Sequence, residues 1–483
     1  KKGGRVEDKY LHSLDSVPLS EIISEEYRNY QIYTLMDRAI PYLQDGLKPG
    51  QRRILYTLWK NQSKGLLKVS SATGLVLTLH PHGPQSIEGA IVNMAQDYSF
   101  SNNYPLIDKK GYFGERMETQ AAASRYIECK LGKLSSLLLF DDINQVEMIP
   151  NYDEKEMEPT ALLPKLPLML LNGAEGIGTG FSSVIPSFHH KDIIASIIKT
   201  IETGRPKKLK PFVRYFDHEI ERGIDRKLIF NMRFEEIDGK IYITEIPRNY
   251  NATRLYKFLS KFIEKDYIKD FIDSSVENEI KVELMFKKGA RPSLEEVRQK
   301  MKCVTSIIPN YTLISDRGVR IFKGPEEIIE IFTKKRLSVV KKRYELLSID
   351  YKKKIRLNNE IILFIKNKEY VKATVSKNRS SYVKYLIDRK FTYSSYLADM
   401  PIYRMTKEEV AKRALQVKED QAKLRECQRI AASSSLVRKK LIEELKDINL
   451  QLNEWEKETE KEKKRIREKK YKKNETKKRK KRN

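Results

Sequence analysis

The sequence predicts a multidomain protein of the mixed α/β class whose C-terminal part is almost entirely helical. Its 483 residues correspond to about three domains of ordinary size. Between about 210 and 325, short alternating runs such as Lys240–Thr244 and Lys281–Phe286 predict strands that lie between helices. From about Glu326 to Asn378, and again from Lys407 to Lys461, Gly and Pro disappear and apolar residues recur with helical spacing.

The first domain is expected to span residues 1–150. A helical pattern from about Tyr27 to Asn61 is broken at Asp45-Gly46 and at Pro49, and the basic run that starts at Gln51 opens a second helix. Helix, short turn and helix is the layout of winged-helix and helix-turn-helix readers of nucleic acid. We therefore expect a winged-helix DNA-binding domain at this end of the chain.

The remaining chain divides where its composition changes. Residues 151–325 are expected to form an α/β domain. Residues 326–460 are expected to form a long antiparallel coiled coil, with a compact knob at about 379–406 between its helices. Residues 461–483 are too charged to bury a core, so we expect a disordered tail or a frayed continuation of the helix.

The charge of the chain favours a polyanionic partner. The formal net charge is +28. Residues 461–483 hold 15 Lys/Arg and 3 Glu, so 15 − 3 = 12 positive charges lie there and 28 − 12 = 16 are spread over the other residues. A basic protein gains affinity for nucleic acid by releasing counterions. For the tail alone, DNA binding and simple solubility remain equally open.

Several classes of protein are excluded. The cysteines Cys129, Cys303 and Cys427 lie far apart and form no CxxC pair, which argues against a disulfide scaffold and a cysteine zinc site. No apolar run approaches the roughly 20 residues that span a bilayer, and no secretory h-region opens the chain. We expect a cytoplasmic protein without a membrane partner.

The first chemical motif is a cluster of cations around a turn. Arg38, Lys48, Arg52 and Arg53 surround the turn that leads into the second helix. Backbone N–H groups at a helix start, assisted by basic side chains, can hold phosphate groups. A solvated basic face is the alternative that charge alone leaves open.

A pair of histidines follows, His80 and His82, on either side of Pro81. No Glu or further His stands at the spacing of a zinc site, and two residues are too few for ligands one helical turn apart. Neutral imidazoles that donate to phosphate oxygens fit a basic protein better. A structural pair in a turn remains the alternative.

The third motif places Tyr126 next to Arg125, after the small residues Ala121–Ala123. Small side chains allow another surface to approach closely, and a neighbouring guanidinium favours the phenolate and neutralises a phosphate in a transition state. The alternative is a packing role, since Tyr126 is one of 26 tyrosines in the chain.

The fourth motif runs from Asn172 to Gly180 and has four glycines in its last eight residues. It matches no P-loop and no dinucleotide fingerprint. Such a segment bends tightly or lies close to another surface. Ile177 near its middle could wedge between base pairs, as in architectural DNA-binding proteins, or could be buried beneath the loop.

The order of these motifs resembles the breakage–reunion region of type IIA DNA topoisomerases. The resemblance rests on DGLKPGQRR at 45–53, HPHG at 80–83, Phe113-Gly114, the segment that ends at Tyr126, and NGAEGIGTG at 172–180. The segment Tyr396–Glu409 resembles the C-gate segment of that family, where the dimer closes at the end of the coiled coil. The resemblance extends from about residue 25 to residue 460.

The resemblance implies a role for each site residue. Tyr126 would form a 5′-phosphotyrosyl bond with DNA, and Arg125 would stabilise the transition state. Ile177 would intercalate and bend the duplex. The residues that would hold the phosphates of the cleaved segment are Arg38, Lys48, Arg52, Arg53, His80 and His82. The α/β domain would be the tower domain of the family, and the knob would be its C-gate.

The resemblance also implies partners. The chain shows no ATPase motif and no acidic metal-binding cluster of the Toprim type, so a second subunit is expected to carry ATP and Mg²⁺, and no metal is expected on this chain. Each tyrosine cuts one strand, which implies a homodimer closed at the winged-helix gate and the C-gate, and an A₂B₂ assembly with the ATPase/Toprim partner. The expected location is a bacterial cytoplasm, with association to the nucleoid.

Two departures from the family pattern shape the expected activity. Gln85 and Gly89 stand where bacterial relatives place the serine and the acidic residue that anchor quinolone drugs, so we expect weak quinolone sensitivity. Nothing in the sequence resembles the DNA-wrapping β-pinwheel, which favours relaxation and decatenation, as in topoisomerase IV. Two alternatives remain: a supercoiling gyrase A-type subunit without its wrapping domain, and a non-enzymatic architectural DNA-binding protein.

Overall fold

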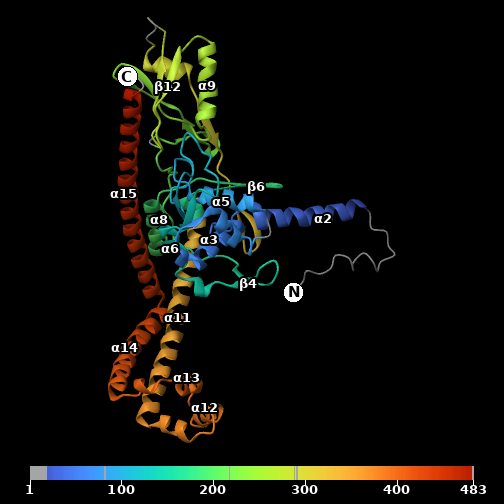
Figure 1. Cartoon of the computed structure of the whole chain (residues 1–483). Coiled ribbons are helices and arrows are strands. Elements are labelled where there is room, and N and C mark those ends of the chain that lie inside the picture. Colours follow the sequence, from blue (N-terminus) through green and yellow to red (C-terminus); the bar gives the residue numbers. More distant parts are fainter. Residues whose placement is uncertain (1–18, 81–82, 217, 288, 290–291, 481–483) are drawn as a thin grey trace. The chain divides into compact units, whose positions relative to one another are not determined.

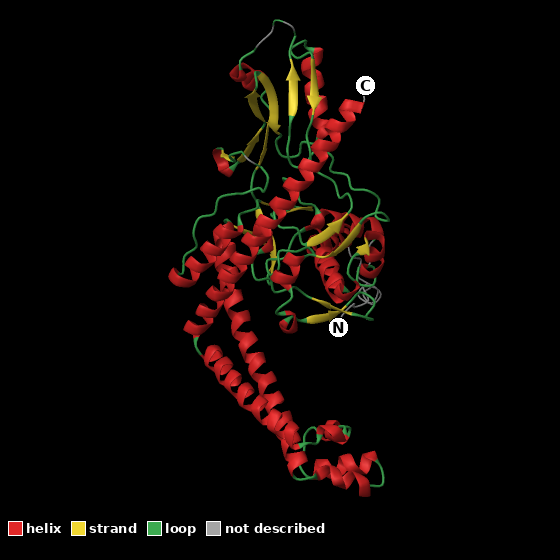
Figure 2. Cartoon of the chain, turned by 60° about the vertical axis from the view of Figure 1, so that its left-hand side comes forward, coloured by secondary structure: helices red, strands yellow, loops and turns green. Residues whose placement is uncertain are grey.

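The computed structural model describes residues 19–80, 83–216, 218–287, 289 and 292–480 (Figure 1). The chain forms two compact units. The first comprises residues 1–333 together with 447–483, and the second comprises residues 334–446. In the described residues, the strands all lie in the first unit and the second unit is helical (Figure 2).

The N-terminal part of the first unit combines helices with a small sheet. The helices are α2 (Leu19–Thr34), which continues into the π-helical turn η1 (Leu35–Ala39), α3 (Pro49–Lys60), α4 (Val69–Val76) and α5 (Pro84–Ala95). The strands β1 (Leu67–Lys68), β2 (Ile107–Lys110) and β3 (Glu128–Leu131) form an antiparallel sheet in the order β1-β3-β2. Pro49 starts α3 because its fixed φ and missing N–H suit the first helical position.

The next segment contains two hairpins and three α-helices. They are α6 (Lys133–Leu139), the 3₁₀ turn η3 (Ile143–Gln145), the hairpin of β4 (Met148–Pro150) and β5 (Met157–Pro159), α7 (Leu168–Leu171), the hairpin of β6 (Ala174–Gly178) and β7 (Phe181–Ile185), and α8 (His190–Thr203). Strand β5 contacts α3, and η1 contacts β6. These contacts bring residues far apart in the sequence to the two helical elements that carry the predicted cations.

The middle of the chain is α/β, as its alternating runs predicted. A four-stranded sheet has the order β10-β11-β13-β12, all antiparallel, with β10 (Arg233–Ile237), β11 (Lys240–Glu245), β12 (Asp270–Asp273) and β13 (Val282–Met285). Its core includes Ile241, Ile243 and Leu284, packed with apolar residues of α9 (Ala252–Glu264) and α10 (Leu294–Lys300).

Short strands complete the first unit. They are β8 (Glu221–Arg222), the 3₁₀ turn η4 (Ile224–Arg226), β9 (Leu228–Asn231), β14 (Val304–Ile307), β15 (Tyr311–Ser315) and β16 (Gly318–Phe322). Strands β14, β9 and β8 form one sheet, and β15 pairs with β16. Asn310, just before β15, bonds to Val184 of β7 in both directions, at 2.8 and 2.9 Å, so this region supports the β6–β7 hairpin.

The second unit contains an antiparallel arrangement of long helices. Helix α11 (Pro325–Lys366) enters it from the first unit, and α14 (Lys407–Ala432) and α15 (Ser434–Lys480) return. Arg336 and Arg343 of α11 each lie 3.0 Å from the Glu444 carboxylate of α15. We expected unbroken helices to Asn378 and from Lys407 to Lys461. Instead α11 ends at Lys366, and the returning arm breaks at the extended residue Ser433.

Between α11 and α14 lies a compact segment with its own core. It comprises the 3₁₀ helix η5 (Glu369–Val375), α12 (Arg379–Asp388), α13 (Ser394–Ala398) and the turn η6 (Ile402–Arg404). Leu386 and Leu397 are fully buried together with Ile361 and Phe364 of α11. Ile402 and Tyr403 remain 80% and 73% exposed, so an apolar surface is left at this segment.

The end of α15 lies within the first unit and differs from a disordered tail. The helix runs to Lys480. Lys463 donates to the backbone oxygen of Asp97 at 2.7 Å and lies 3.1 Å from its carboxylate, and Arg467 lies 3.4 Å from Glu279. For residues 461–483 we expected a disordered tail or a continuation of the helix. The structure has the continuing helix as far as Lys480. Residues 481–483 lie outside the described residues.

Cys129, Cys303 and Cys427 are buried and free. Among the described residues, every helix is too short or too polar to cross a bilayer.

Candidate functional site

Tyr126 lies at the surface, in a turn directly before β3. Its side chain is 65% exposed, so the interpretation of this tyrosine as a core residue is excluded. The turn is tied to α4, because Val69 N donates to Ile127 O at 3.0 Å and Ser70 N to Ser124 O at 3.4 Å. A phenol oxygen is thereby presented to solvent on a fixed backbone.

Arg125 stands beside this phenol. Its guanidinium carbon lies 4.6 Å from the centre of the Tyr126 ring. Both side chains are exposed. A delocalised cation at this distance can interact with the ring and can also reach a phosphate that approaches the hydroxyl. The structure therefore presents a phenol and a guanidinium side by side on one exposed turn.

The cations predicted around α3 differ in how accessible their charged groups are to a phosphate. Arg38 is exposed at the end of η1. Lys48 is half-buried, and burial lowers the pKa of its ammonium group below the ordinary value. Arg52 is 5% exposed, and its Nε lies 2.6 Å from Asp45 Oδ2 while its guanidinium covers the Tyr42 ring. In this conformation Arg52 is engaged with the protein, so its contact with DNA stays a prediction.

Arg53 and His80 are brought together, although the sequence separates them by a helix. Arg53 Nη1 lies 3.2 Å from His80 Nδ1. The other side of the guanidinium makes two bonds to Glu158, from Nε at 2.6 Å and from Nη2 at 2.9 Å. His82, the second predicted histidine, lies outside the described residues.

Ile177 is at the end of the β6–β7 hairpin and is 89% exposed, which excludes the alternative of a buried isoleucine. The hairpin projects from the first unit (Figure 1). Its two-residue turn, Thr179-Gly180, has Gly180 at φ +79°. An aliphatic side chain at the tip of a rigid two-stranded ribbon can enter a base step.

The base of this hairpin is packed tightly against η1. A methyl group at Gly176 would lie 2.0 Å from the carbonyl oxygen of Ala39 and 3.6 Å from Lys48 Nζ, and one at Gly178 would lie 2.4 Å from Leu35 Cδ2. Glycine is therefore required at Gly176, where the clash is with backbone, whereas at Gly178 the end of the Leu35 side chain would have to move. The structure thus brings Lys48 next to the ribbon that carries Ile177.

Sequence reasoning missed three partners of the predicted residues. Glu158 holds Arg53, Asp45 holds Arg52, and Arg248 forms an ion pair with Glu175 of β6. Asp45 stands in the same motif as Arg52, so its role had a local signal. Glu158 and Arg248 had none, since each lies in a different segment from its partner.

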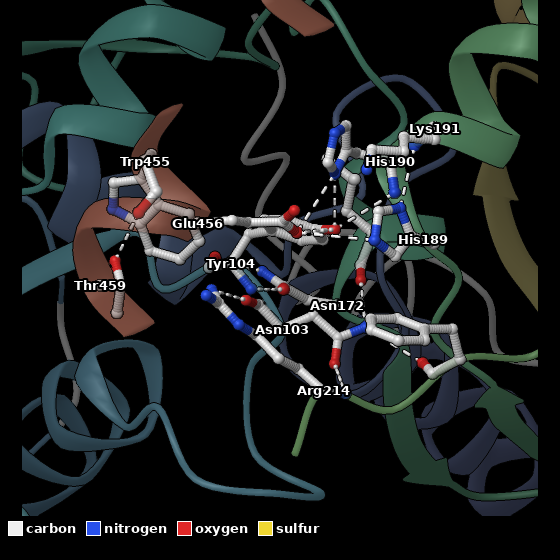
Figure 3. A network of polar contacts seen from close by, with 12 residues as sticks. Asn103, Tyr104, Asn172, His189, His190, Lys191, Arg214, Trp455, Glu456 and Thr459 are labelled. Atoms are coloured by element: carbon white, nitrogen blue, oxygen red, sulfur yellow. Dashed lines mark hydrogen bonds and ion pairs between the residues drawn. The ribbon is translucent and has the colours of Figure 1, made fainter. Parts of the chain in front are cut away.

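A second polar cluster joins α15 to the start of α8 (Figure 3). His189, His190 and Glu456 offer ligand atoms within 4.8 Å of one another. Tyr104 Oη lies 2.9 Å from His190 Nδ1 and donates to Glu456 Oε1 at 3.2 Å. Arg214 lies 4.5 Å from the Trp455 ring centre in the same region.

The donor arrangement of this cluster does not fit a metal site. A histidine that ligates a metal usually donates its other ring N–H. Nδ1 of His189 instead accepts the Lys191 N–H at 3.2 Å, as the N-cap of α8, so the proton of its neutral ring is on Nε2 and neither ring nitrogen is open to a metal. The cluster is a hydrogen-bonded anchor for α15.

The chain is similar to known proteins both in sequence and in fold. A family profile for the A-type subunit of DNA gyrase and topoisomerase IV matches residues 38–446. A crystal structure of the Plasmodium falciparum topoisomerase II DNA-binding, cleavage and re-ligation domain superposes with a TM-score of 0.74 at 25% identity, covering 89% of this chain and 64% of that one.

Two of the relatives match over about half of the chain. DNA topoisomerase 2 of Arabidopsis thaliana is 36% identical over 245 residues, which are 49% of this chain and 17% of that protein. The A-type subunit of DNA topoisomerase 4 from Bacillus subtilis (strain 168) is 35% identical over 266 residues, which are 50% of this chain and 33% of that protein. The aligned segments thus cover a third or less of these two relatives. Because the family profile matches most of the chain, the chain belongs to the family of A-type subunits of DNA gyrase and topoisomerase IV.

Proposed function

We propose that this chain is the DNA cleavage and religation subunit of a type IIA topoisomerase, with Tyr126 as its nucleophile. The observation that carries the proposal is the exposed phenol of Tyr126 on an anchored turn, with the Arg125 guanidinium beside it. The family match supports the same assignment, because its members are subunits of DNA topoisomerases.

The reaction is a transesterification. The phenol oxygen of Tyr126 attacks a backbone phosphorus, a 5′-phosphotyrosyl bond forms, and the bond from phosphorus to the 3′-oxygen breaks. The proton of the phenol leaves as the attack proceeds, and the 3′-oxygen departs as a hydroxyl. One phosphodiester replaces another, so the reverse attack by the 3′-hydroxyl reseals the strand without a nucleotide. Arg125 stabilises the charge that develops on the phosphate oxygens.

The basic residues around α3 hold the cleaved segment. Arg38, Lys48, Arg53, His80 and His82 contact its phosphates, and Arg52 contributes either directly or by supporting the turn through Asp45. Ile177 enters a base step and bends the duplex. Bending a site of this kind costs about 1–6 kcal/mol, which the additional basic contacts on a bent duplex offset.

Mg²⁺ and ATP belong to a second subunit in this proposal. Among the described residues, the one group of His, Cys, Asp and Glu close enough to share an ion is His189, His190 and Glu456, and it contains neither Tyr126 nor its neighbours. In this proposal the metal is held by the partner and not by this chain. The assembly is an A₂B₂ heterotetramer with an ATPase/Toprim partner, and its activity is relaxation and decatenation by passage of one duplex through another.

The homodimer is closed at two places. Each tyrosine cuts one strand, so a double-strand break needs two copies of this chain. The exposed Ile402 and Tyr403 of the compact segment in the second unit supply an apolar surface suited to the C-gate contact, and the winged-helix regions form the DNA gate. We place the enzyme in a bacterial cytoplasm, in association with the nucleoid.

The test is a trapped-adduct assay. The chain is incubated with labelled duplex, the partner subunit, Mg²⁺ and ATP, and the reaction is stopped with denaturant. We expect a covalent protein–DNA adduct that is lost in Tyr126→Phe and retained in Tyr152→Phe, a control tyrosine that is also exposed. DNA binding without any adduct would favour the architectural alternative. ATP-driven negative supercoiling of a plasmid would favour the gyrase-type alternative.

A further inference from the structure

We propose that Glu158 is a positioning residue that acts through Arg53 to hold His80 as the neutral tautomer with its proton on Nε2. The proposal rests on the function proposed above, in which His80 donates to a phosphate of the cleaved segment. Glu158 itself touches neither DNA nor the reacting atoms in this account.

The contact between Glu158 and Arg53 is a bidentate ion pair. Nε of Arg53 donates to Oε2 at 2.6 Å, and Nη2 donates to Oε1 at 2.9 Å. The arginine and glutamate side chains are 13% and 7% exposed. Two parallel bonds fix the plane of a guanidinium as well as its position, which a single bond would not do. The third nitrogen, Nη1, is therefore aimed in one direction.

That direction is His80. Nη1 of Arg53 lies 3.2 Å from His80 Nδ1. A guanidinium has only donors and does not lose its proton in proteins, so Nδ1 must accept. An accepting Nδ1 carries no hydrogen, and in the neutral ring the proton is then on Nε2. The arginine thus determines the tautomer of the histidine, and the carboxylate determines the position of the arginine.

The environment of the ring favours the neutral form. His80 is 8% exposed, and burial of an imidazolium next to a guanidinium is costly. The ring edge faces the first turn of α3, since a methyl group at Gly50 would lie 3.4 Å from His80 Cε1 and 3.7 Å from Nε2. The N–H of Nε2 is therefore beside the helix start where phosphate binding is proposed.

Arg53 stays charged in this arrangement. Burial by itself would lower the pKa of its guanidinium, but the hydrogen bond and the charge of Glu158 outweigh burial and raise it. Asp37 lies 3.9 Å from Nη2 and adds to the same effect. Without Glu158, Arg53 would lose its fixed orientation, and His80 would lose the donor that excludes a proton from Nδ1.

The chain provides a matched control two residues away. Glu156 forms an ion pair with Lys60 of α3 at 3.0 Å, and the glutamate and lysine side chains are 39% and 43% exposed. This pair also joins the β5 region to α3, yet Lys60 makes its contact at the opposite end of the helix from Arg53. Removal of the Glu156 charge therefore measures how the loss of a purely structural ion pair affects cleavage, DNA affinity and stability.

The experiment compares Glu158→Gln with Glu156→Gln in the full chain, in complex with its partner. We expect Glu158→Gln to lower the single-turnover rate of DNA cleavage roughly ten- to a hundred-fold, as misplacement of a positioned group does. DNA affinity should change less than about two-fold. Thermal stability should fall, because Arg53 loses the carboxylate of a buried pair, so cleavage rates are compared at a temperature at which every variant is folded. Glu156→Gln should match the parent protein in all three measurements.

A spectroscopic measurement tests the tautomer without any cleavage. The chain has six histidines, so ¹⁵N-histidine labelling with His80→Gln for assignment gives a tractable spectrum. We expect His80 of the parent protein at pH 7 to have a bare Nδ1 and a protonated Nε2, and Glu158→Gln to show a mixture of tautomers or a protonated ring. If Glu158→Gln does not fold, Arg53→Lys replaces it, because a lysine cannot bond to Glu158 and His80 at once. This variant should also show a mixture of tautomers or a protonated ring.

The two proposals fail in different ways. An Nδ1–H tautomer in the parent protein, or equal cleavage rates for Glu158→Gln and Glu156→Gln, would overturn the role of Glu158 while leaving Tyr126 in place. Absence of an adduct in the parent protein would overturn the proposed function, and the ¹⁵N spectrum would then still decide whether Arg53 sets the His80 tautomer.

Discussion

Arg248, which follows strand β11 of the α/β domain, forms an ion pair with Glu175 at the base of the hairpin that carries Ile177. The arginine side chain is 15% exposed and the glutamate 58%. Burial lowers the pKa of the Arg248 guanidinium. The contact ties the exposed hairpin to a neighbouring part of the first unit.

Replacement of Arg248 by alanine should therefore reduce DNA bending. A partly exposed ion pair contributes about 0.5–1 kcal/mol, which corresponds to a roughly two- to five-fold change in the equilibrium between straight and bent duplex. Energy transfer between dyes at the ends of a short duplex measures the bend. Arg254→Ala serves as the control, because the guanidinium of that arginine donates to the nearby Asn249 carbonyl, at 2.7 Å. Equal bending by both variants would contradict the prediction.

Replacement of Ile177 by alanine should separate stability from DNA bending. The side chain is 89% exposed, so the free energy of unfolding should change by less than about 0.5 kcal/mol. Loss of the wedge should remove about 1.5–3 kcal/mol of apolar burial in the bent complex, a roughly ten-fold or larger drop in bent DNA. Ile224→Ala is the comparison, since Ile224 is 86% exposed in the turn η4. A bent fraction as high as that of the parent would exclude the wedge role.

Replacement of Arg52 by alanine should destabilise the fold more than it weakens DNA binding. It leaves the fully buried Asp45 carboxylate without its cation, although the backbone N–H groups of Leu47 and Leu162 still donate to it at 3.0 Å. Loss of one partner of a buried pair costs about 3–5 kcal/mol. Urea unfolding of the parent and of Arg52→Ala measures this cost. An unchanged unfolding midpoint, combined with weaker DNA binding, would show that Arg52 acts on DNA directly.

The cluster at the start of α8 should make stability depend on pH. Burial and the neighbouring His190 lower the pKa of His189 to about 4, while Glu456 opposes them. The unfolded chain then binds a proton near the ordinary pKa of 6.5, and the folded chain does not. The contribution of His189 to the free energy of unfolding is therefore fully present above pH 6.5. It falls by on the order of 2 kcal/mol as the pH drops from 6.5 toward 4.

His189→Asn tests this dependence, because asparagine preserves the N-cap of α8 without titrating. The slope of the unfolding free energy between pH 4.5 and 6.5 should be smaller in this variant, by calorimetry or denaturant titration. Burial by itself would raise the pKa of Glu456, but its hydrogen bond to His190 and the charges of His190 and the nearby cations outweigh burial and lower the pKa. Below about pH 4.5, protonation of this carboxyl therefore reduces the free energy of unfolding further. Parallel pH curves for parent and variant would contradict the assignment.

The sequence by itself determined the local elements and the order of the chemical motifs. Alternation in 240–244 gave a strand with Ile241 and Ile243 buried on one face, since side chains of a strand alternate between its faces. Absence of Gly and Pro gave the long helices α11, α14 and α15. The glycines around Ile177 indicated a tight turn, and the turn before β3 carries Arg125 and Tyr126 together because they are adjacent in the chain.

Only the tertiary structure decided which cations are free and which are held. Glu158 is 105 residues from Arg53 along the chain, and a local pattern contains no information about an ion pair of that separation. The same holds for Arg248 and Glu175, and for the burial of Arg52 on Asp45, where periodicity allowed an exposed face. Burial and charge pairing are properties of the packed chain, because they depend on which segments exclude water from one another.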